Sequence, residues 1–392
     1  MAKHRELRSV KDNNMKILIL PNWYPSPKNP FIGNAMKEQA KAVSLYHEVT
    51  VLYHEDYDKH CKGFYQVVYD KEKDGIRTII IQSKKLLGPI ISYFISQWSI
   101  FDCFKKLLLR KGWKPNVVHA HFFLAGMPAV LIGKRQKIPI VISEHLSTLS
   151  RHRLTITSKL KARYVLKKAD IILPVSQALM EGIKSYGINN KFDIVPNVVN
   201  NKIFYPATNN KDKSITKMLY VGRLRHIKGI QFLIEAVAEL KKKREDFVLD
   251  IVGHGQQREF ENLSKNLGLD KIITFHGPKT KEEVSDFMRN CDFLVQPSLY
   301  ETFGVVYIEA MACGKPVIGT SAGGPKEFIT KDRGVLVPPE NVNTLVDAID
   351  YMLDNYQNYS PSKISQYIKE NFSYEAVGKK IDNIYRDVLK KK

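Results

Sequence analysis

The sequence predicts an α/β protein made of two Rossmann-like domains, each with a parallel sheet, and three observations support this. The 392 residues exceed what one hydrophobic core usually serves. Hydrophobic residues make up 44% of the chain and charged residues 26%, which is ordinary globular composition. Short β-branched runs alternate with amphipathic stretches in both halves, as in parallel sheets covered by helices on both faces.

Twelve segments have the composition of buried strands. Those of the first half are 16–21, 48–53, 76–81, 116–121, 138–143 and 170–176. Those of the second half are 217–222, 247–253, 272–277, 291–298, 315–320 and 334–339.

Between the two sets, residues 193–214 contain two prolines and many asparagines with little periodicity, which is typical of a linker. The predicted divisions are an N-terminal extension 1–14, an N-terminal domain 15–195, a linker 196–214, a C-terminal domain 215–371 and a C-terminal helix 372–392. Because open α/β sheets bind ligands beyond the carboxyl ends of their strands, we expect the active-site loops there, in a crevice between the domains.

The N-terminal segment and the cysteines indicate an intracellular protein. Residues 1–14 are polar and lack the apolar region of a signal peptide or a membrane span. The four cysteines are scattered, without a C-x-x-C pair or a nearby histidine at ligand spacing. We therefore expect neither a disulfide framework nor a zinc site, and a reducing cytoplasm fits best.

Positive charge is concentrated in the first half of the chain. Residues 1–200 carry 32 Lys+Arg against 15 Asp+Glu, a net +17, whereas residues 201–392 carry 29 against 25, a net +4. Such an excess favours an anionic partner, such as a phospholipid surface, a pyrophosphate-bearing substrate or nucleic acid. A generally basic proteome is the alternative, but it explains the asymmetry less well.

The most informative motif is at 298–329, where Glu301 and Glu309 are separated by seven residues. We predict a strand, a loop and then a helix from about Phe303 to Cys313, with Gly314 as its C-cap. Glu301 would precede the helix and Glu309 would lie two turns inside it. A helix N-terminus suits a diphosphate, and a carboxylate nearby can bind the vicinal hydroxyls of a sugar or ribose. Two solvated surface glutamates would show the same spacing.

Cations follow a second predicted strand. Arg223 and Lys228 lie in the loop after the strand that ends at Gly222, where they can clamp a pyrophosphate. Arginine and lysine are also common in ordinary loops. A G-x-G at 253–255 follows another strand, but it lacks the third glycine and the downstream ribose-binding acid of a dinucleotide site.

Together these segments resemble the retaining glycosyltransferases of family 4, the type that builds bacterial capsule, lipopolysaccharide and exopolysaccharide. The resemblance begins at Met15 and includes 195–206, 221–229, 251–255, 275–277 and the E-x(7)-E of Glu301 and Glu309. It implies the GT-B fold, in which two Rossmann-like domains face each other across a cleft. It also implies that the C-terminal helix crosses back to the first domain.

The resemblance also implies roles for individual residues of the second half. Glu309 matches the ribose-binding glutamate, and Glu301 matches the glutamate near the hydroxyls of the donor sugar. Arg223 and Lys228 match the pair that binds the diphosphate. The donor-binding set it implies is Gly33, Arg223, Lys228, Gly253, Gly277, Pro278, Lys279, Glu301, Thr302, Phe303, Gly304, Val305 and Glu309.

In the first half, His121 matches a family histidine beside the anomeric face of the sugar. A histidine at a strand end is often packed rather than catalytic, and His119, two residues earlier on the same face, competes for the role. Gly33 lies in the first strand–helix loop, although this loop lacks the usual Gly-Gly pair. Glu144 and His145 close another strand and are candidates for the acceptor side.

The family implies retention of anomeric configuration, with the leaving diphosphate helping to deprotonate the acceptor. The catalytic set is then His121, Arg223, Lys228 and Glu301, and the cations stabilise the developing charge in place of a metal ion. We expect no required metal and no cofactor, with a nucleotide sugar, UDP-linked by preference, as co-substrate. The D-x-D at Asp56–Asp58 resembles the metal motif of the other, single-domain glycosyltransferase fold, but a solvated loop is the favoured interpretation.

Two segments of the first half point to a lipid or membrane partner. Residues 86–110 are the most apolar stretch but contain Pro89, Asp102, Lys105 and Lys106, so a peripheral amphipathic segment or a buried helix fits better than a membrane span. Residues 151–170 interleave seven basic residues with apolar ones, and they either face anionic headgroups or form a solvated helix face.

We therefore expect transfer of a hexose or N-acetylhexosamine to a lipid-linked or polysaccharide acceptor. The enzyme would be cytoplasmic and peripheral on an anionic membrane surface, as a monomer or homodimer. A GT-B-shaped UDP-sugar epimerase is one alternative, and it would need no acceptor. A basic nucleic-acid-binding or membrane-binding protein is another, but no nucleic-acid-binding signature accompanies the charge, so we expect no nucleic-acid partner.

Overall fold

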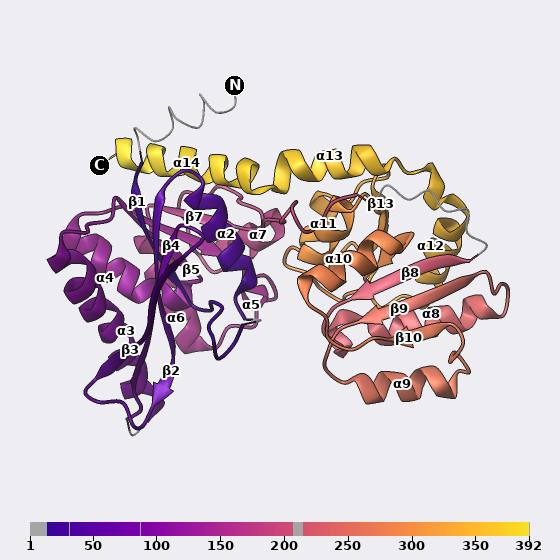
Figure 1. Cartoon of the computed structure of the whole chain (residues 1–392), viewed down its shortest axis with the longest axis horizontal. Helices are drawn as coiled ribbons and strands as arrows, with labels where there is room; N and C mark the ends of the chain where they lie inside the picture. The colour runs from indigo at the N-terminus through magenta and orange to yellow at the C-terminus, as the bar shows by residue number, and fades with distance from the viewer. Residues whose placement is uncertain (1–13, 31, 87, 207–214, 392) are drawn as a thin grey trace. The chain divides into compact units, whose positions relative to one another are not determined.

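The computed structural model describes residues 14–30, 32–86, 88–206 and 215–391, and the chain forms two compact units (Figure 1). Unit 1 comprises the described residues up to Val198 together with those from Tyr374 onward. Unit 2 comprises the described residues of Val199–Ser373. The predicted extension 1–14 lies almost entirely outside the described residues, as does the second half of the predicted linker.

The sheet of unit 1 has the order β3-β4-β2-β1-β5-β6-β7. All neighbouring strands pair in parallel except β3 and β4, which are antiparallel. The chain runs outward from β1 in one direction and then restarts at β5, so the β1/β5 boundary is the topological switch point. The strands are β1 Lys16–Pro21, β2 Glu48–Asp58, β3 Tyr65–Lys73, β4 Ile76–Lys84, β5 Val117–His121, β6 Ile140–Glu144 and β7 Ile171–Pro174.

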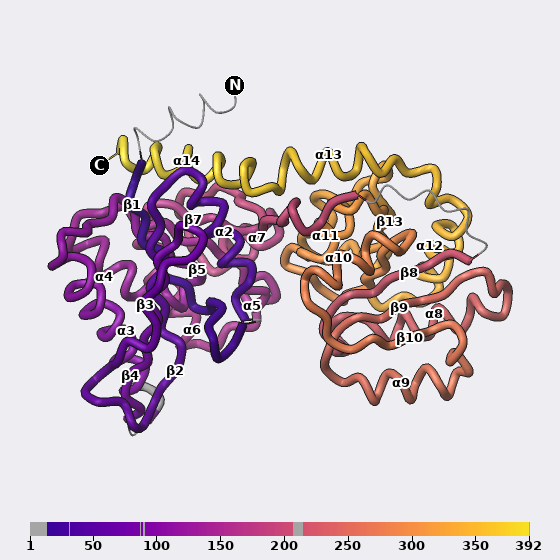
Figure 2. Tube along the Cα trace, in the orientation of Figure 1, coloured from indigo at the N-terminus to yellow at the C-terminus, as the bar shows by residue number. Residues whose placement is uncertain are grey.

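The helices of unit 1 include one from the far end of the chain. Apolar side chains of α14 join the same core as those of β1 and β2, and Figure 2 shows its yellow trace within this unit. The helices are α2 Asn34–Ser44, α3 Pro89–Cys103, α4 Gly126–Gln136, α5 Ser147–Ser150, α6 Ile156–Lys168, α7 Gln177–Lys184 and α14 Tyr374–Lys390, with the 3-10 turn η4 at Phe123–Ala125.

The sheet of unit 2 is wholly parallel, with the order β10-β9-β8-β11-β12-β13 and its switch point between β8 and β11. Its strands are β8 Thr216–Val221, β9 Phe247–Val252, β10 Ile273–Phe275, β11 Phe293–Val295, β12 Val317–Thr320 and β13 Gly334–Val337. Its helices are α8 Ile230–Lys241, α9 Gln257–Asn266, α10 Lys281–Asn290, α11 Val305–Ala312, α12 Val342–Asn355 and α13 Pro361–Phe372, with the 3-10 turn η5 at His226–Lys228.

The predicted fold class, two Rossmann-like parallel-sheet units, is confirmed, and each of the twelve predicted segments contains a strand. Strand β3 was not predicted, because its sequence is polar and mostly exposed. It forms a hairpin with β4 through Asp74 and Gly75, which both have positive φ. Within the described part of the predicted linker, Val198 packs in the core of unit 1 and Phe204 is buried. Within the described ranges, no helix is long and apolar enough to cross a bilayer.

Gly378 allows α14 to pack closely on α2. A Cβ at Gly378 would lie 2.3 Å from the backbone oxygen of Ala42 and 2.8 Å from the ring of Tyr46. We predict that Gly378→Val destabilises unit 1 by about 1–3 kcal/mol, because the helices must separate to admit the side chain.

The measurement is urea unfolding followed by tryptophan fluorescence, which reports on unit 1 because all three tryptophans, Trp23, Trp98 and Trp113, belong to it. The neighbouring exposed Lys379 supplies the control, Lys379→Ala, which should leave the midpoint unchanged. An unchanged midpoint in Gly378→Val would show that this helix contact is not close.

Candidate functional site

The loops after β8 and β11 meet at the switch point of unit 2. Arg223 lies two residues after the end of β8, and Lys228 ends η5. The amide of Leu299, in the loop after β11, donates to the oxygen of Ile227 at 3.0 Å. The predicted cations and the predicted glutamate loop therefore lie side by side.

Glycines allow these loops to approach backbone to backbone. A Cβ at Gly229 would lie 1.8 Å from the oxygen of Pro297, and one at Gly253 would lie 1.8 Å from the oxygen of Gly222. Both glycines have positive φ, at 71° and 155°. No other residue type fits these two positions without moving the loops.

The central contact of the site is an ion pair between Lys228 and Glu301. Lys228 Nζ lies 2.6 Å from Glu301 Oε1, and the hydroxyl of Ser298 donates to the same oxygen at 2.9 Å. The Glu301 side chain is only 12% exposed. Its backbone is fixed as well, because Glu301 accepts from the amide of Gly324 at 2.9 Å and donates to Ala322 at 3.2 Å.

The loop at 321–324 belongs to the 298–329 motif, but no role was predicted for it from the sequence. A Cβ at Gly323 would lie 2.0 Å from the oxygen of Glu301, and one at Gly324 would lie 2.4 Å from that of Thr302. These two glycines support the loop that carries the glutamate. The Gly323-Gly324 pair was the only sign of this role in the sequence. Each glycine contacts a residue 22 positions earlier in the chain, and the sequence alone did not show that contact.

Helix α11 begins at Val305, two residues later than predicted, with Gly304 as its N-cap at φ 89°. Thr302 and Phe303 therefore belong to the preceding turn, and Glu309 is half-buried just over one turn inside the helix rather than two. The ring of Tyr307 lies beneath Gly304, where a Cβ would be 2.5 Å away. The first N–H groups of α11 have no acceptor within the helix, so this turn can bind an anion.

The other predicted donor residues follow the next strands of the sheet. Gly253 follows β9, and its amide donates to the oxygen of Gly277, after β10, at 2.9 Å. Pro278 and Lys279 continue that loop, and Lys279 lies 3.4 Å from Glu283 of α10.

In unit 1, His119 and His121 lie on one face of β5 with their rings stacked at 4.7 Å. His119 is hydrogen-bonded at both ring nitrogens, to Tyr385 of α14 at 2.6 Å and to Ser143 at 2.8 Å. His121 pairs with Pro21 at the switch point, and its Nε2 has no hydrogen-bond partner among the described residues. His119 is thus packed in a structural role, whereas His121 has a buried ring nitrogen without a hydrogen-bond partner among the described residues.

Glu144 and His145 extend this buried cluster. His145 stacks on His121, with 3.4 Å between their nearest nitrogens. Burial lowers the pKa of His145 to about 4 and holds the pKa of His121 well below its ordinary value. Burial raises the pKa of Glu144 to about 8, although backbone amides, including that of Phe123, partly oppose this. At neutral pH the cluster is therefore uncharged, and Glu144 holds a proton.

Two further predictions fall on loops and strands of unit 1. Gly33 is the N-cap of α2, and a Cβ there would lie 2.5 Å from the backbone of Trp23, so the glycine is needed for packing. The interpretation of Asp56–Asp58 as a solvated loop is wrong, because these residues continue β2. Asp56 pairs with Lys28 at 3.0 Å. Across the described residues, no group of three or more His, Cys, Asp or Glu side chains is placed to hold a metal ion.

Two family models match adjacent segments of the chain. "Glycosyltransferase Family 4" matches residues 36–202, and "Glycosyl transferases group 1" matches residues 201–371. The chain belongs to glycosyltransferase family 4. Membership favours glycosyl transfer over the two alternatives, a UDP-sugar epimerase and a noncatalytic binding protein.

Relatives and solved structures agree with this family. An uncharacterized glycosyltransferase of Methanocaldococcus jannaschii is 29% identical over 385 residues, which are 95% of this chain and 99% of that protein. A D-inositol 3-phosphate glycosyltransferase of Paenarthrobacter aurescens is 26% identical over 265 residues, 62% of this chain and 65% of that one. The crystal structure of Anabaena HepE with UDP has a TM-score of 0.75 at 19% identity, covering 95% and 100% of the two chains. The fold of this glycosyltransferase is GT-B.

The buried Glu144 predicts an unusual pH dependence. At pH 6.5 the unfolded chain has lost the Glu144 proton but keeps about half of the protons of its histidines, whose ordinary pKa is about 6.5, whereas the folded cluster holds only the Glu144 proton. Between pH 6.5 and 8 the contribution of Glu144 to stability therefore falls by about 2 kcal/mol, and the three histidines oppose this fall with a rise of about 1 kcal/mol.

We expect the stability of Glu144→Gln relative to wild type to rise by about 2 kcal/mol over this window, as measured by urea unfolding of unit 1 at pH 6.5, 7.2 and 8. The exposed Glu181 on α7 provides the control, since Glu181→Gln should leave the wild-type slope intact. The same slope in wild type and Glu144→Gln would contradict a protonated Glu144.

Proposed function

We propose that this glycosyltransferase transfers a hexose or N-acetylhexosamine, with retention of configuration, from a nucleotide diphosphate sugar to a lipid-linked or polysaccharide acceptor. UDP is the favoured nucleotide, and the product belongs to a cell-surface glycan. The observation that carries the proposal is the Lys228–Glu301 pair, held by three loops at the switch point of unit 2. The protein would work in the cytoplasm, peripheral on an anionic membrane.

The donor diphosphate would replace Glu301 as the main partner of Lys228. Diphosphate carries more negative charge than a carboxylate, so it competes for the ammonium, and Arg223 adds a second cation from the same loop. Glu301 stays in place because Ser298 and the 321–324 loop hold it independently of Lys228. Its carboxylate is then available for the hydroxyls of the donor sugar, while Glu309 binds those of the ribose.

Bond cleavage would leave negative charge on the departing diphosphate. Arg223, Lys228 and the N-terminus of α11 stabilise that charge as it develops, and for this reason we propose a metal-independent reaction. The nucleotide sugar is a substrate, and no further cofactor is needed. Support for UDP comes from the likeness to Anabaena HepE, whose structure contains it.

Unit 1 would supply the acceptor side. His121 has a neutral imidazole whose buried Nε2 is unpaired among the described residues, and this nitrogen would hydrogen-bond a sugar or an acceptor hydroxyl that reaches it, without introducing charge. His145 would position and desolvate His121 from the neighbouring strand end, where Glu144 accepts from the amide of Phe123.

Thermal-shift measurements with UDP, GDP, ADP and their sugars, with and without EDTA, test the donor site. We predict that one nucleotide series raises the melting temperature, that EDTA does not change the shift, and that Glu309→Ala abolishes it. Stabilisation follows RT ln(1 + [L]/Kd), which is about 2.7 kcal/mol at a hundredfold excess over Kd.

The exposed Glu282 on α10 offers a matched control, because Glu282→Ala should shift like wild type. The configuration of the transferred sugar, read by proton NMR, tests retention separately. No response to any nucleotide would refute the proposed donor site, and a shift abolished by EDTA would refute metal independence.

A further inference from the structure

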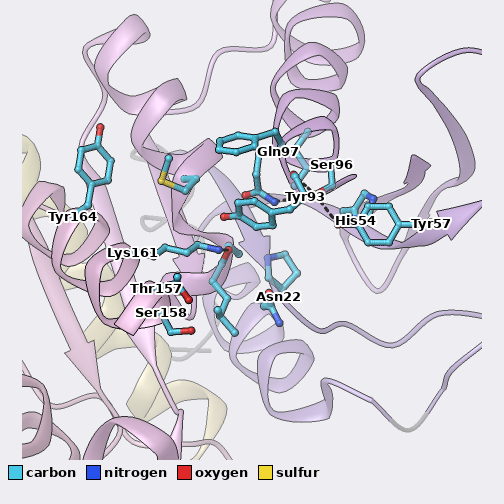
Figure 3. Close-up of a pocket in the computed structure, with 16 residues that line it drawn as sticks. Asn22, His54, Tyr57, Tyr93, Ser96, Gln97, Thr157, Ser158, Lys161 and Tyr164 are labelled. Atoms are coloured by element: carbon cyan, nitrogen blue, oxygen red, sulfur yellow. Dashed lines mark hydrogen bonds between the residues drawn. The ribbon is translucent and has the colours of Figure 1, made fainter. Parts of the chain in front are cut away.

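Unit 1 contains a pocket of about 850 Å³ between α3, α4, α6 and the loop after β1 (Figure 3). This is large enough for a small organic ligand. Most of its walls are carbon, contributed by aromatic and aliphatic side chains that include Tyr93, Phe94, Ile100, Leu124, Met127 and Tyr164.

One cation projects into this apolar space. Lys161 of α6 has its Nζ 4.0 Å from the centre of the Tyr93 ring and donates to the oxygen of Leu124 at 3.1 Å. Burial lowers the pKa of Lys161 to about 8. Among the ion pairs of the described residues none involves Lys161, so its charge is balanced only by a ring face and one carbonyl.

The polar groups around Lys161 are mostly engaged elsewhere. His54 is hydrogen-bonded to Ser83 at 2.8 Å, and Tyr57 to Ser96 at 3.3 Å. The hydroxyl of Tyr93 and the Oε1 of Gln97 are buried and have no partner among the described residues. Apart from these groups and Lys161, most of the surface that lines the pocket is apolar, which suits a hydrocarbon with one anionic group better than a glycan.

Apolar side chains continue from the pocket onto exposed helix faces. On α6, Ile156, Leu160 and Tyr164 recur every four residues and are 80%, 64% and 46% exposed. On α3, Phe94 is 62% exposed. Helices on a globular surface normally turn their polar side outward, so this arrangement indicates contact with an amphiphile.

Helix α6 also carries positive charge, which would attract an anionic amphiphile. Four further basic residues lie on α6, namely Lys159, Arg163, Lys167 and Lys168, and it has no acidic residue. Anionic headgroups attract such a surface, whereas a neutral apolar ligand would not need it.

We propose that this pocket binds the hydrocarbon chain of a lipid phosphate and that Lys161 pairs with its phosphate. The lipid phosphate would be the membrane-embedded part of the acceptor, so the acceptor assignment rests on the proposed glycosyl transfer, whereas the binding site itself does not. The exposed apolar residues of α3 and α6 would contact the lipid where it leaves the pocket.

Isothermal titration with decyl phosphate, below its micellar concentration, tests the site directly. We expect one molecule of decyl phosphate to bind per chain. The variant Lys161→Gln should bind it roughly 10- to 100-fold more weakly, because a charged hydrogen bond is lost. The control Lys167→Gln should bind it within twofold of wild type. Decyl glucoside, which has the chain without the charge, should bind as weakly to wild type as decyl phosphate binds to Lys161→Gln. Inorganic phosphate, which lacks the chain, should not bind measurably.

Gln97→Trp tests the space itself, because Gln97 lines the pocket and the larger side chain should fill it and abolish decyl phosphate binding. The melting temperature and far-UV circular dichroism of each variant without ligand show that the chain is folded, independently of the donor site. Equal binding by wild type and Lys161→Gln would overturn the proposal. So would equal losses in Lys161→Gln and Lys167→Gln, which would indicate diffuse surface charge, or binding to anionic vesicles without binding of monomeric decyl phosphate.

The two proposals fail separately. If decyl phosphate binds and no nucleotide does, the donor site is wrong and the lipid pocket stands. If a nucleotide binds and decyl phosphate does not, the donor site stands and the acceptor is not held by a chain in this pocket.

Discussion

The close approach of the loops after β8, β11 and β12 is the constraint on which the donor site depends. Glycines at 229, 323 and 324 let the backbones approach closely enough for Lys228 to reach Glu301. The ion pair keeps a lysine and a mostly buried glutamate neutral as a pair while the site is empty. The diphosphate would then enter a site whose charges are already placed, so little ordering cost remains when the donor binds.

In unit 2 a buried site keeps two opposite charges as a pair, whereas in unit 1 burial leaves the ionisable side chains around His121 uncharged. There it removes charge, because the stacked histidines and Glu144 have no counter-ion and are held neutral by desolvation. The last helix takes part in this arrangement, since Tyr385 of α14 fixes His119, which stacks on His121. The chain's C-terminal segment therefore shapes the residue proposed to meet the sugar.

Most of the fold could be predicted because each buried strand has a continuous apolar run. The location of Arg223, Lys228 and Glu301 could be predicted as well, because the carboxyl ends of parallel strands lie at one edge of a sheet. Strand β3 was missed because its residues are polar, although the Asp74-Gly75 turn was a usable signal. The sequence left His119 and His121 as competitors, since the partner that distinguishes them is 266 residues away. The pocket around Lys161 was not visible in the sequence because three helices must pack before it exists.

The most direct test of the donor-site account compares the affinity of the preferred nucleoside diphosphate with that of its monophosphate, for wild type and Lys228→Gln. If Lys228 binds the distal phosphate, the substitution should weaken diphosphate binding roughly 10- to 100-fold and leave monophosphate binding within about threefold. An equal loss for both nucleotides, or no loss for either, would contradict the role given to the Lys228–Glu301 pair.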